Sequence, residues 1–206
     1  MARRIGGAGG GSDKGGGGTV LLAVGVALAL GAGGASVAGS TATSGASSGA
    51  RSGSRVDNRT SQALETRLTS RGIRLTSRIT DDDADCVAHS YGQVQDFLRR
   101  SPCTALHRAQ FELRDRNGDV VLLAVSWVEM SSEAAAGSLR ELLDTEGTGN
   151  IIELSRERGR YRTIRYGGDA YASSRDGTVV ATAQAEPVAR RTSGLVLTTI
   201  VNEAVQ

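Results

Sequence analysis

The chain reads HRAQFELRDRNGDVVLLAVSWVEM from residue 107 to residue 130. Polar and apolar side chains alternate strictly over His107–Leu113, which is typical of a strand with one buried face. Asn117-Gly118 follows, and this dipeptide is the strongest short hairpin signal because both positions tolerate positive φ. Val120–Met130 is almost entirely apolar and is therefore expected to be a central strand. The stretch predicts an antiparallel hairpin at the heart of a sheet.

A two-residue loop would also fix the register of this hairpin. It pairs Phe111 with Ala124, and it places Arg108 opposite Trp127 on the other face, where the two side chains can form a cation–π contact. An exposed sheet patch around Trp127, Val125 and Val121 would then favour partner binding or homodimerisation.

The residues around the hairpin predict one α+β domain over residues 80–206. A second hairpin is expected around Asp176-Gly177, formed by Arg160–Ala172 and Thr178–Ala185. Helical patterns with apolar stripes cover Ser90–Arg100, Ser132–Asp144 and Gly194–Val205. The simplest arrangement is an antiparallel sheet built from two hairpins, with the helices on one face.

A short repeat precedes this domain. RLTSR occurs at residues 67–71 and again at residues 74–78. A period of seven returns each residue to nearly the same face of a helix, so residues 59–79 are predicted to form a helix that packs one edge on the domain. The alternative is a membrane-surface or coiled-coil helix.

The N-terminal third of the chain predicts that the folded domain is located outside the cytoplasm. Thr19–Ala38 carries no charge and is long enough to cross a bilayer as a transmembrane helix. A cleaved signal segment and a buried soluble helix are the alternatives. Residues 1–18 are expected to be a disordered cytoplasmic tail, and residues 39–58 a flexible Ser/Gly linker. Basic residues flank the apolar segment equally, so charge alone does not set the orientation.

The two cysteines favour an orientation that places the domain outside the cytoplasm. Cys86 and Cys103 are expected to form one disulfide, as pairs do in oxidising compartments. They lie near His89 and His107 in the sequence, so the first alternative is a zinc site with these four residues as ligands. The second alternative is that both cysteines are free thiols. We expect the domain to lie outside the cytoplasm on a single-pass membrane anchor, or to be secreted after signal cleavage.

A row of alternating arginines gives the clearest candidate surface. If the chain is extended, Arg156, Arg158, Arg160 and Arg162 point to one side and form a basic edge that suits anionic lipid, an anionic envelope polymer or an acidic partner. The alternative is an edge strand that its charges protect from aggregation. Together with Arg108 and Trp127, these residues are the predicted interaction surface.

Composition narrows the function further. The net charge is only +2, the chain has seven aromatic residues among Trp, Tyr and Phe, and Lys14 is the single lysine among 24 basic residues. This arginine bias is typical of GC-rich bacterial coding, and the mixed charges argue against a nucleic-acid partner. No catalytic or cofactor motif is present, so we expect no catalytic residues, no cofactor and no metal ion. The sequence favours a membrane-anchored, extracytoplasmic binding or accessory domain of the bacterial envelope. The alternatives are an exported enzyme using His89 and His107, or a structural protein that contacts wall or membrane.

Overall fold

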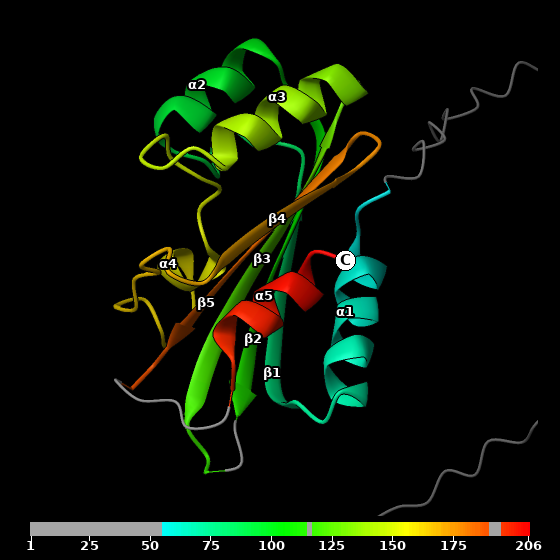
Figure 1. Ribbon diagram of the computed structural model, residues 1–206. Helices are drawn as coiled ribbons and strands as arrows, with labels where there is room; N and C mark the ends of the chain where they lie inside the picture. The colour runs from blue at the N-terminus through cyan, green and yellow to red at the C-terminus, as the bar shows by residue number, and fades with distance from the viewer. Residues whose placement is uncertain (1–54, 115–116, 190–194) are drawn as a thin grey trace, which may run out of the picture. The chain divides into compact units, whose positions relative to one another are not determined.

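The computed structural model describes residues 55–114, 117–189 and 195–206. Within these ranges five strands form one antiparallel sheet in the order β1-β2-β3-β5-β4 (Figure 1). The strands are β1 (Arg74–Asp83), β2 (Cys103–Arg114), β3 (Val120–Met130), β4 (Tyr171–Asp176) and β5 (Val179–Pro187). The helices are α1 (Asn58–Ser70), α2 (Gly92–Arg100), α3 (Glu133–Leu143), α4 (Leu154–Glu157) and α5 (Leu197–Ala204). The α+β class is confirmed, and a hairpin turn occurs at each of the two predicted positions.

The predicted tail, membrane segment and most of the linker lie outside the described residues. In the part of the chain that the structure describes, no helix is long and apolar enough to cross a membrane.

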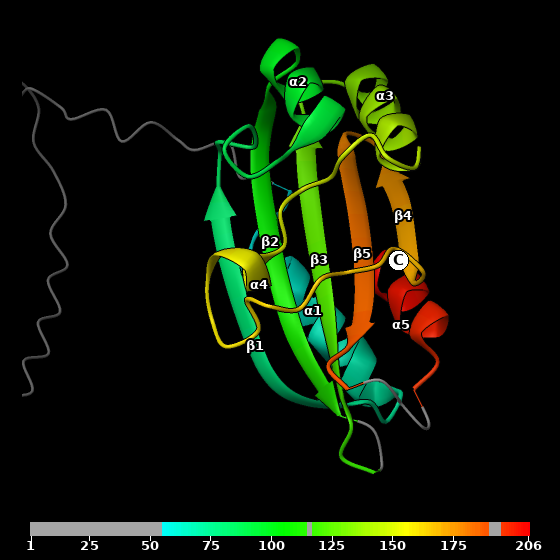
Figure 2. The same ribbon diagram turned by 90° about the vertical axis from the view of Figure 1, so that its left-hand side faces the viewer.

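Helices cover both faces of the sheet, which corrects the prediction of helices on one face. Helices α1 and α5 pack on the face that carries Phe111, Leu123 and Ala183. Helices α2 and α3 pack on the other face, over Leu106 and Val128. Figure 2 shows α2, α3 and α4 on the side of the sheet nearest the viewer and α1 behind it. The near-continuous apolar run of β3 is what a strand buried on both faces requires.

The register of the β2–β3 hairpin differs from the prediction by one residue. Arg114 pairs with Val120, so the connection spans residues 115–119 and is longer than two residues. His107, and not Arg108, stands opposite Trp127. Because side chains alternate between faces, this shift places Arg108 and Trp127 on opposite sides of the sheet. The predicted contact between them does not form.

The predicted helix over residues 59–79 is correct only in its first half. Helix α1 starts at an N-cap whose side chain, that of Asp57, accepts from the backbone N–H of Arg59, and it ends at Ser70. Gly72 follows with φ +78°, a conformation that commonly ends helices. The second RLTSR copy therefore lies in β1, where it pairs with β2. One pentapeptide adopts two structures because the sheet edge offers hydrogen bonds to the second copy.

The folded part of the chain consequently begins before residue 80. Leu64 and Leu68 of α1 are fully buried, and Val56, which falls in the predicted linker, is 4% exposed.

In the second hairpin, β4 begins at Tyr171 and not at Arg160. The preceding residues form α4 and a long irregular segment on the face opposite α1 and α5.

Two backbone segments meet closely between α2 and α3. The N–H of Gln93 donates to the carbonyl of Thr148 at 2.7 Å, and the N–H of Tyr91 donates to the carbonyl of Asn150 at 3.1 Å. Gly149 stands at the point of closest approach with φ +105°, and a Cβ there would lie 2.1 Å from the carbonyl oxygen of Tyr91. This contact holds the start of α2 against the turn that follows α3.

Replacing Gly149 with alanine should therefore destabilise the domain more than the same change at Gly147. Gly147 also has positive φ (+81°), but no atom lies within 4 Å of the position that a Cβ would take there. We expect Gly147→Ala to cost about 1–2 kcal/mol from backbone conformation alone. Gly149→Ala should cost roughly 1–3 kcal/mol more because the backbone of Tyr91 must move. Urea unfolding of both variants measures the difference, and equal losses would contradict the close approach.

Candidate functional site

Arg108 is the centre of a buried ion cluster and not part of a surface. It is 1% exposed. Its guanidinium donates to both carboxylate oxygens of Glu157 at 2.9 Å, to the carbonyl oxygen of Ile152 at 2.9 Å and to Asp81. These contacts join β1, β2 and α4. The prediction that Arg108 belongs to an interaction surface is therefore wrong.

His89 and Arg158 extend this cluster. The two ring nitrogens of His89 lie 2.9 Å from Glu157 and 3.0 Å from Asp83, and Arg158 donates to Asp81. Burial raises the pKa of Asp81 and of Glu157, but their hydrogen bonds to the arginines and the positive charges outweigh burial. The pKa of each carboxyl group therefore lies below its usual value, and both groups are ionised at neutral pH. The cluster pins α4 to the sheet.

Trp127 is also buried and does not belong to an exposed surface. It is 5% exposed, and Val125 and Val121 beside it are also buried. Its ring lies 5.4 Å from that of His107, whose Nδ1 is 2.5 Å from a carboxylate oxygen of Asp82. Because α1 and α5 cover this face, the exposed sheet patch expected from the sequence does not exist.

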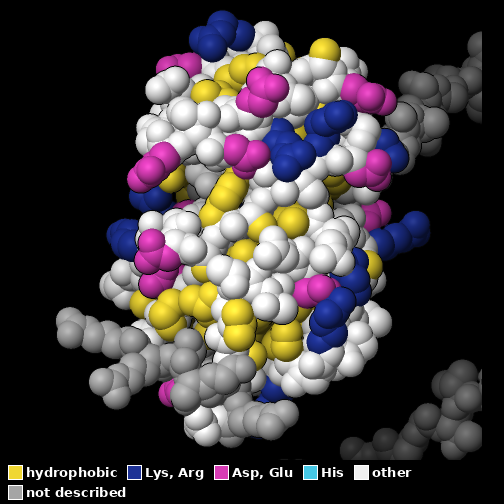
Figure 3. Space-filling model, in the orientation of Figure 1, with side chains coloured by type: hydrophobic (Ala, Val, Ile, Leu, Met, Phe, Trp, Pro, Cys, Tyr) yellow, Lys and Arg dark blue, Asp and Glu magenta, His cyan; other side chains and the backbone are white. Residues whose placement is uncertain are grey.

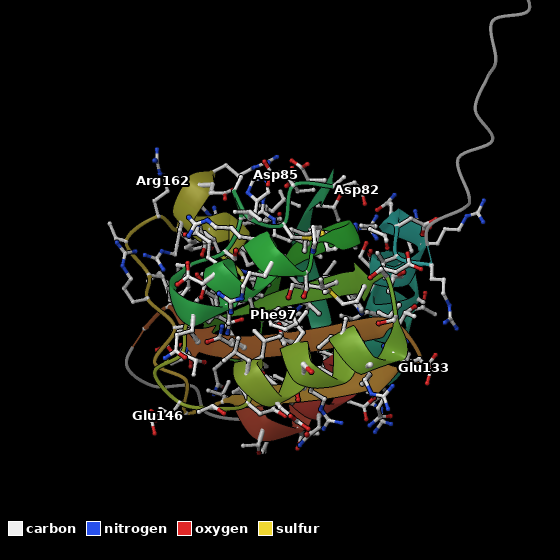
Figure 4. All side chains as sticks on the ribbon, turned by 90° about the horizontal axis from the view of Figure 1, so that it is seen from above. Asp82, Asp85, Phe97, Glu133, Glu146 and Arg162 are labelled. Carbon is white, nitrogen blue, oxygen red and sulfur yellow. A yellow bond between two sulfur atoms is a disulfide. The ribbon has the colours of Figure 1, made fainter. Side chains whose placement is uncertain are left out.

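The four arginines do not form a row along a strand. Arg156 lies in α4, and the residues from Arg158 onward are irregular up to β4. Three of the four are paired with carboxylates: Arg156 with Glu153, Arg158 with Asp81 and Arg160 with Glu112. Arg162 points away from the domain on the segment after α4 (Figure 4). On the face seen in Figure 3, basic and acidic side chains are interspersed.

The predicted disulfide is confirmed. Cys86 and Cys103 are bonded, with 6.3 Å between their Cα atoms. The bond ties the turn after β1 to the first residue of β2. With both sulfur atoms bonded to each other, the alternative four-ligand zinc set is not formed. Within the described ranges, no group of three or more candidate metal ligands occurs.

One of several hollows on the described part of the chain lies between the end of α3 and the start of β4, and we call it the tyrosine pocket. It encloses about 440 Å³. Three of the four tyrosines of the chain line it, Tyr91, Tyr166 and Tyr171. The glycine-containing turn at residues 147–150 and the backbone of Gly167 and Gly168 complete its walls.

The floor of the tyrosine pocket is polar. Asn150 and Gln184 line it, and the same two residues line a smaller cavity of about 20 Å³ beneath α4. A space of that size holds about one water molecule. Glu153 lines the smaller cavity, is 9% exposed and receives a hydrogen bond from Gln184 at 3.4 Å. Burial raises the pKa of Glu153.

One oxygen of Glu153 is left without a hydrogen bond. Its Oε2 is buried and accepts none from the described residues, although Arg156 Nη1 lies 3.8 Å away. Such groups carry a desolvation cost that a bound polar group or water relieves. The pocket thus has aromatic walls above an incompletely satisfied polar base.

The tyrosine hydroxyls are held neutral. Burial raises the pKa of Tyr166 and of Tyr171, and the hydroxyl of Tyr171 donates to Asp144 at 3.1 Å. Burial also raises the pKa of Tyr91, which is 41% exposed. The pocket therefore presents uncharged phenol rings at physiological pH.

Sequence reasoning missed this site. Its tyrosines stand at positions 91, 166 and 171, and no periodicity or spacing connects them before the fold brings them together. Comparisons of the chain with family models, with curated proteins and with solved structures found no match. The chemistry of the site is therefore the guide to function.

Proposed function

We propose that this chain is a membrane-anchored, extracytoplasmic binding domain of the bacterial envelope, and that the tyrosine pocket is its binding site. The observation that carries the proposal is the pocket itself. Its volume of about 440 Å³ lies in the ordinary range for ligand sites, and aromatic walls around a few polar groups are typical of such sites. The disulfide supports an oxidising compartment.

Binding is favoured over catalysis by what surrounds the pocket. Among the described residues that line it there is no histidine, cysteine or serine. The exported-enzyme alternative relies on His89 and His107, but both of their environments are structural. Both ring nitrogens of His89 meet carboxylates, and His107 is fully buried. A general base needs reach to a substrate proton, and neither side chain lines the pocket.

Two other partners are less well supported. The ion pairs of Arg156, Arg158 and Arg160 neutralise much of the charge that an anionic envelope polymer would need. Homodimerisation through the sheet loses its basis because α1 and α5 cover that face. The membrane partner, through residues 19–38, stays part of the proposal.

Protease added to intact cells tests the location. We expect the domain of the full-length chain to be digested under conditions that spare a cytoplasmic marker protein, and the rest of the chain to fractionate with membranes. Recovery of an intact domain in the medium, with a new N-terminus, would replace the anchor with a cleaved signal. Full protection in intact cells and digestion after lysis would overturn the proposed location.

A further inference from the structure

We propose that the tyrosine pocket recognises an organic cation, that is, an ammonium or guanidinium group. The inference rests on the proposed function, in which this pocket is the binding site, and it adds the chemical class of the ligand.

The charge of the lining gives the first argument. Asp144 and Glu146 line the pocket, whereas no lysine, arginine or histidine among the described residues does so. Glu146 stands at the edge of the domain, at the end of α3 farthest from Glu133 (Figure 4). Three arginines lie nearby: Arg140 Nε is 3.4 Å from Asp144, Arg156 pairs with Glu153, and the charge of Arg165 also acts on Glu153. These ion pairs offset the charges of Asp144 and Glu153, so the negative charge of Glu146 in the lining is what favours a positive ligand over an anion.

A further carboxylate contacts one of the lining residues. Glu186 accepts a hydrogen bond from the backbone N–H of Gly167 at 3.1 Å, and Gly167 lines the pocket. Glu186 and Glu153 add negative charge near the pocket, although neither lines it. These carboxylates come from β5, from the turn after α3 and from the segment before α4, so they do not all belong to one acidic turn.

The aromatic walls give the second, independent argument. A neutral phenol ring attracts a cation to its face when the two are within about 6 Å. The Tyr91 ring already makes one such contact, since Cζ of Arg156, a residue that does not line the pocket, lies 5.7 Å from its centre. Tyr91 is also one of two large hydrophobic side chains that the described part of the chain exposes.

The buried acceptor below the floor gives the third argument. A protonated amine or a guanidinium group carries several N–H donors and no acceptor, and Glu153 Oε2 is a buried acceptor with no hydrogen bond from the described residues. A bound water in the small cavity can relay this contact, because that cavity and the pocket share Asn150 and Gln184. The same class of ligand, an organic cation, thus suits the tyrosine rings, the carboxylates and this oxygen of Glu153.

Saturation-transfer NMR on the full-length chain in nonionic detergent tests this class. The probes are N-acetyl-arginine amide and N-acetyl-lysine amide, which carry side-chain cations, ethanolamine and spermidine as free cations with N–H donors, and N-acetyl-citrulline amide as the neutral isostere of arginine. We expect the cations to bind and the citrulline amide not to bind. Whichever cations bind more tightly, side-chain or free, identify the source of the natural ligand.

Matched variants locate the binding. Tyr91→Leu should weaken binding of the best cation about three- to thirtyfold, the range for losing one cation–π contact. Tyr161→Leu is the control, because Tyr161 is the one tyrosine outside the pocket and lines a different hollow. If Tyr91→Leu unfolds, Glu146→Gln serves instead and should also weaken binding.

Three results would overturn the inference: no cation binding at millimolar concentration, equal binding of the citrulline amide, or equal weakening by Tyr161→Leu. Tighter binding of a neutral sugar such as N-acetylglucosamine, weakened by Tyr91→Leu, would refute the cation and keep the pocket as a binding site. None of these results bears on whether the domain lies outside the cell, which the protease experiment decides separately.

Discussion

A chain that starts at residue 80 should not fold, whereas a chain that starts at residue 55 should. The shorter chain lacks α1 and most of β1. It loses the fully buried Leu64 and Leu68, and it breaks the pairing of β1 with β2 from Arg74 to Ile79. Emptying the space of one buried leucine costs about 2–5 kcal/mol, and a whole domain is stable by only about 5–15 kcal/mol. The combined loss is therefore as large as the stability that the domain has.

The two chains can be compared by amide NMR dispersion and by urea unfolding. We expect dispersed signals and a cooperative transition for residues 55–206, and collapsed signals without a transition for residues 80–206. A cooperative transition in the shorter chain would show that α1 and the first part of β1 are dispensable additions to an independent core.

Arg108→Met should be the most damaging single substitution in the ion cluster. It would leave Asp81 and Glu157 without their shared buried partner. Removing one member of a buried ion pair costs about 3–5 kcal/mol. We expect the lower end, about 3 kcal/mol, because His89 still contacts Glu157 and Arg158 still contacts Asp81.

Arg162→Met is the matched control, since Arg162 points away from the domain on the segment after α4. It should change stability by less than about 0.5 kcal/mol. The midpoints of urea unfolding at neutral pH give both values. Similar effects of the two substitutions would mean that the cluster does not pin α4 to the sheet.

Local sequence signals predict most of the elements but not their relation to one another. Short-range patterns reveal the apolar stripes of α2, α3 and α5 and the turn at Asp176-Gly177. The residues that form each of these features lie within a few positions of one another in the sequence. The register of β2 and β3 depends on where the ladder closes, and Arg114 already pairs with Val120. The Asn117-Gly118 signal correctly locates the turn, but it does not determine how many residues the turn contains.

Two predictions fail because a local pattern fits more than one structure. The RLTSR repeat suggests a single helix because a period of seven suits that geometry, but the positive φ of Gly72 separates the copies. Trp127 is expected to be exposed only if helices cover one face of the sheet. The apolar run in β3 also fits a strand covered on both sides, and that arrangement predicts a buried Trp127.

The tyrosine pocket is beyond prediction for a different reason. Tyr91 precedes α2, Tyr166 lies in the segment before β4, and Tyr171 is the first residue of β4. Only the tertiary fold, with Gly149 allowing its backbone to approach that of Tyr91, brings the three side chains to one hollow. A site assembled from distant segments leaves no local pattern in a single sequence.

The location of the domain, on which the proposed function depends, is tested most directly by the redox state of its cysteines in cells. Cells making the full-length chain are lysed into excess alkylating agent, and the peptides are analysed by mass spectrometry without reduction. An exported domain should yield Cys86 and Cys103 as one linked, unalkylated pair. A chain starting at residue 39, which stays in the cytosol, should yield alkylated cysteines under the same treatment because the cytosol keeps thiols reduced. Alkylation of both cysteines in the full-length chain would contradict an extracytoplasmic domain.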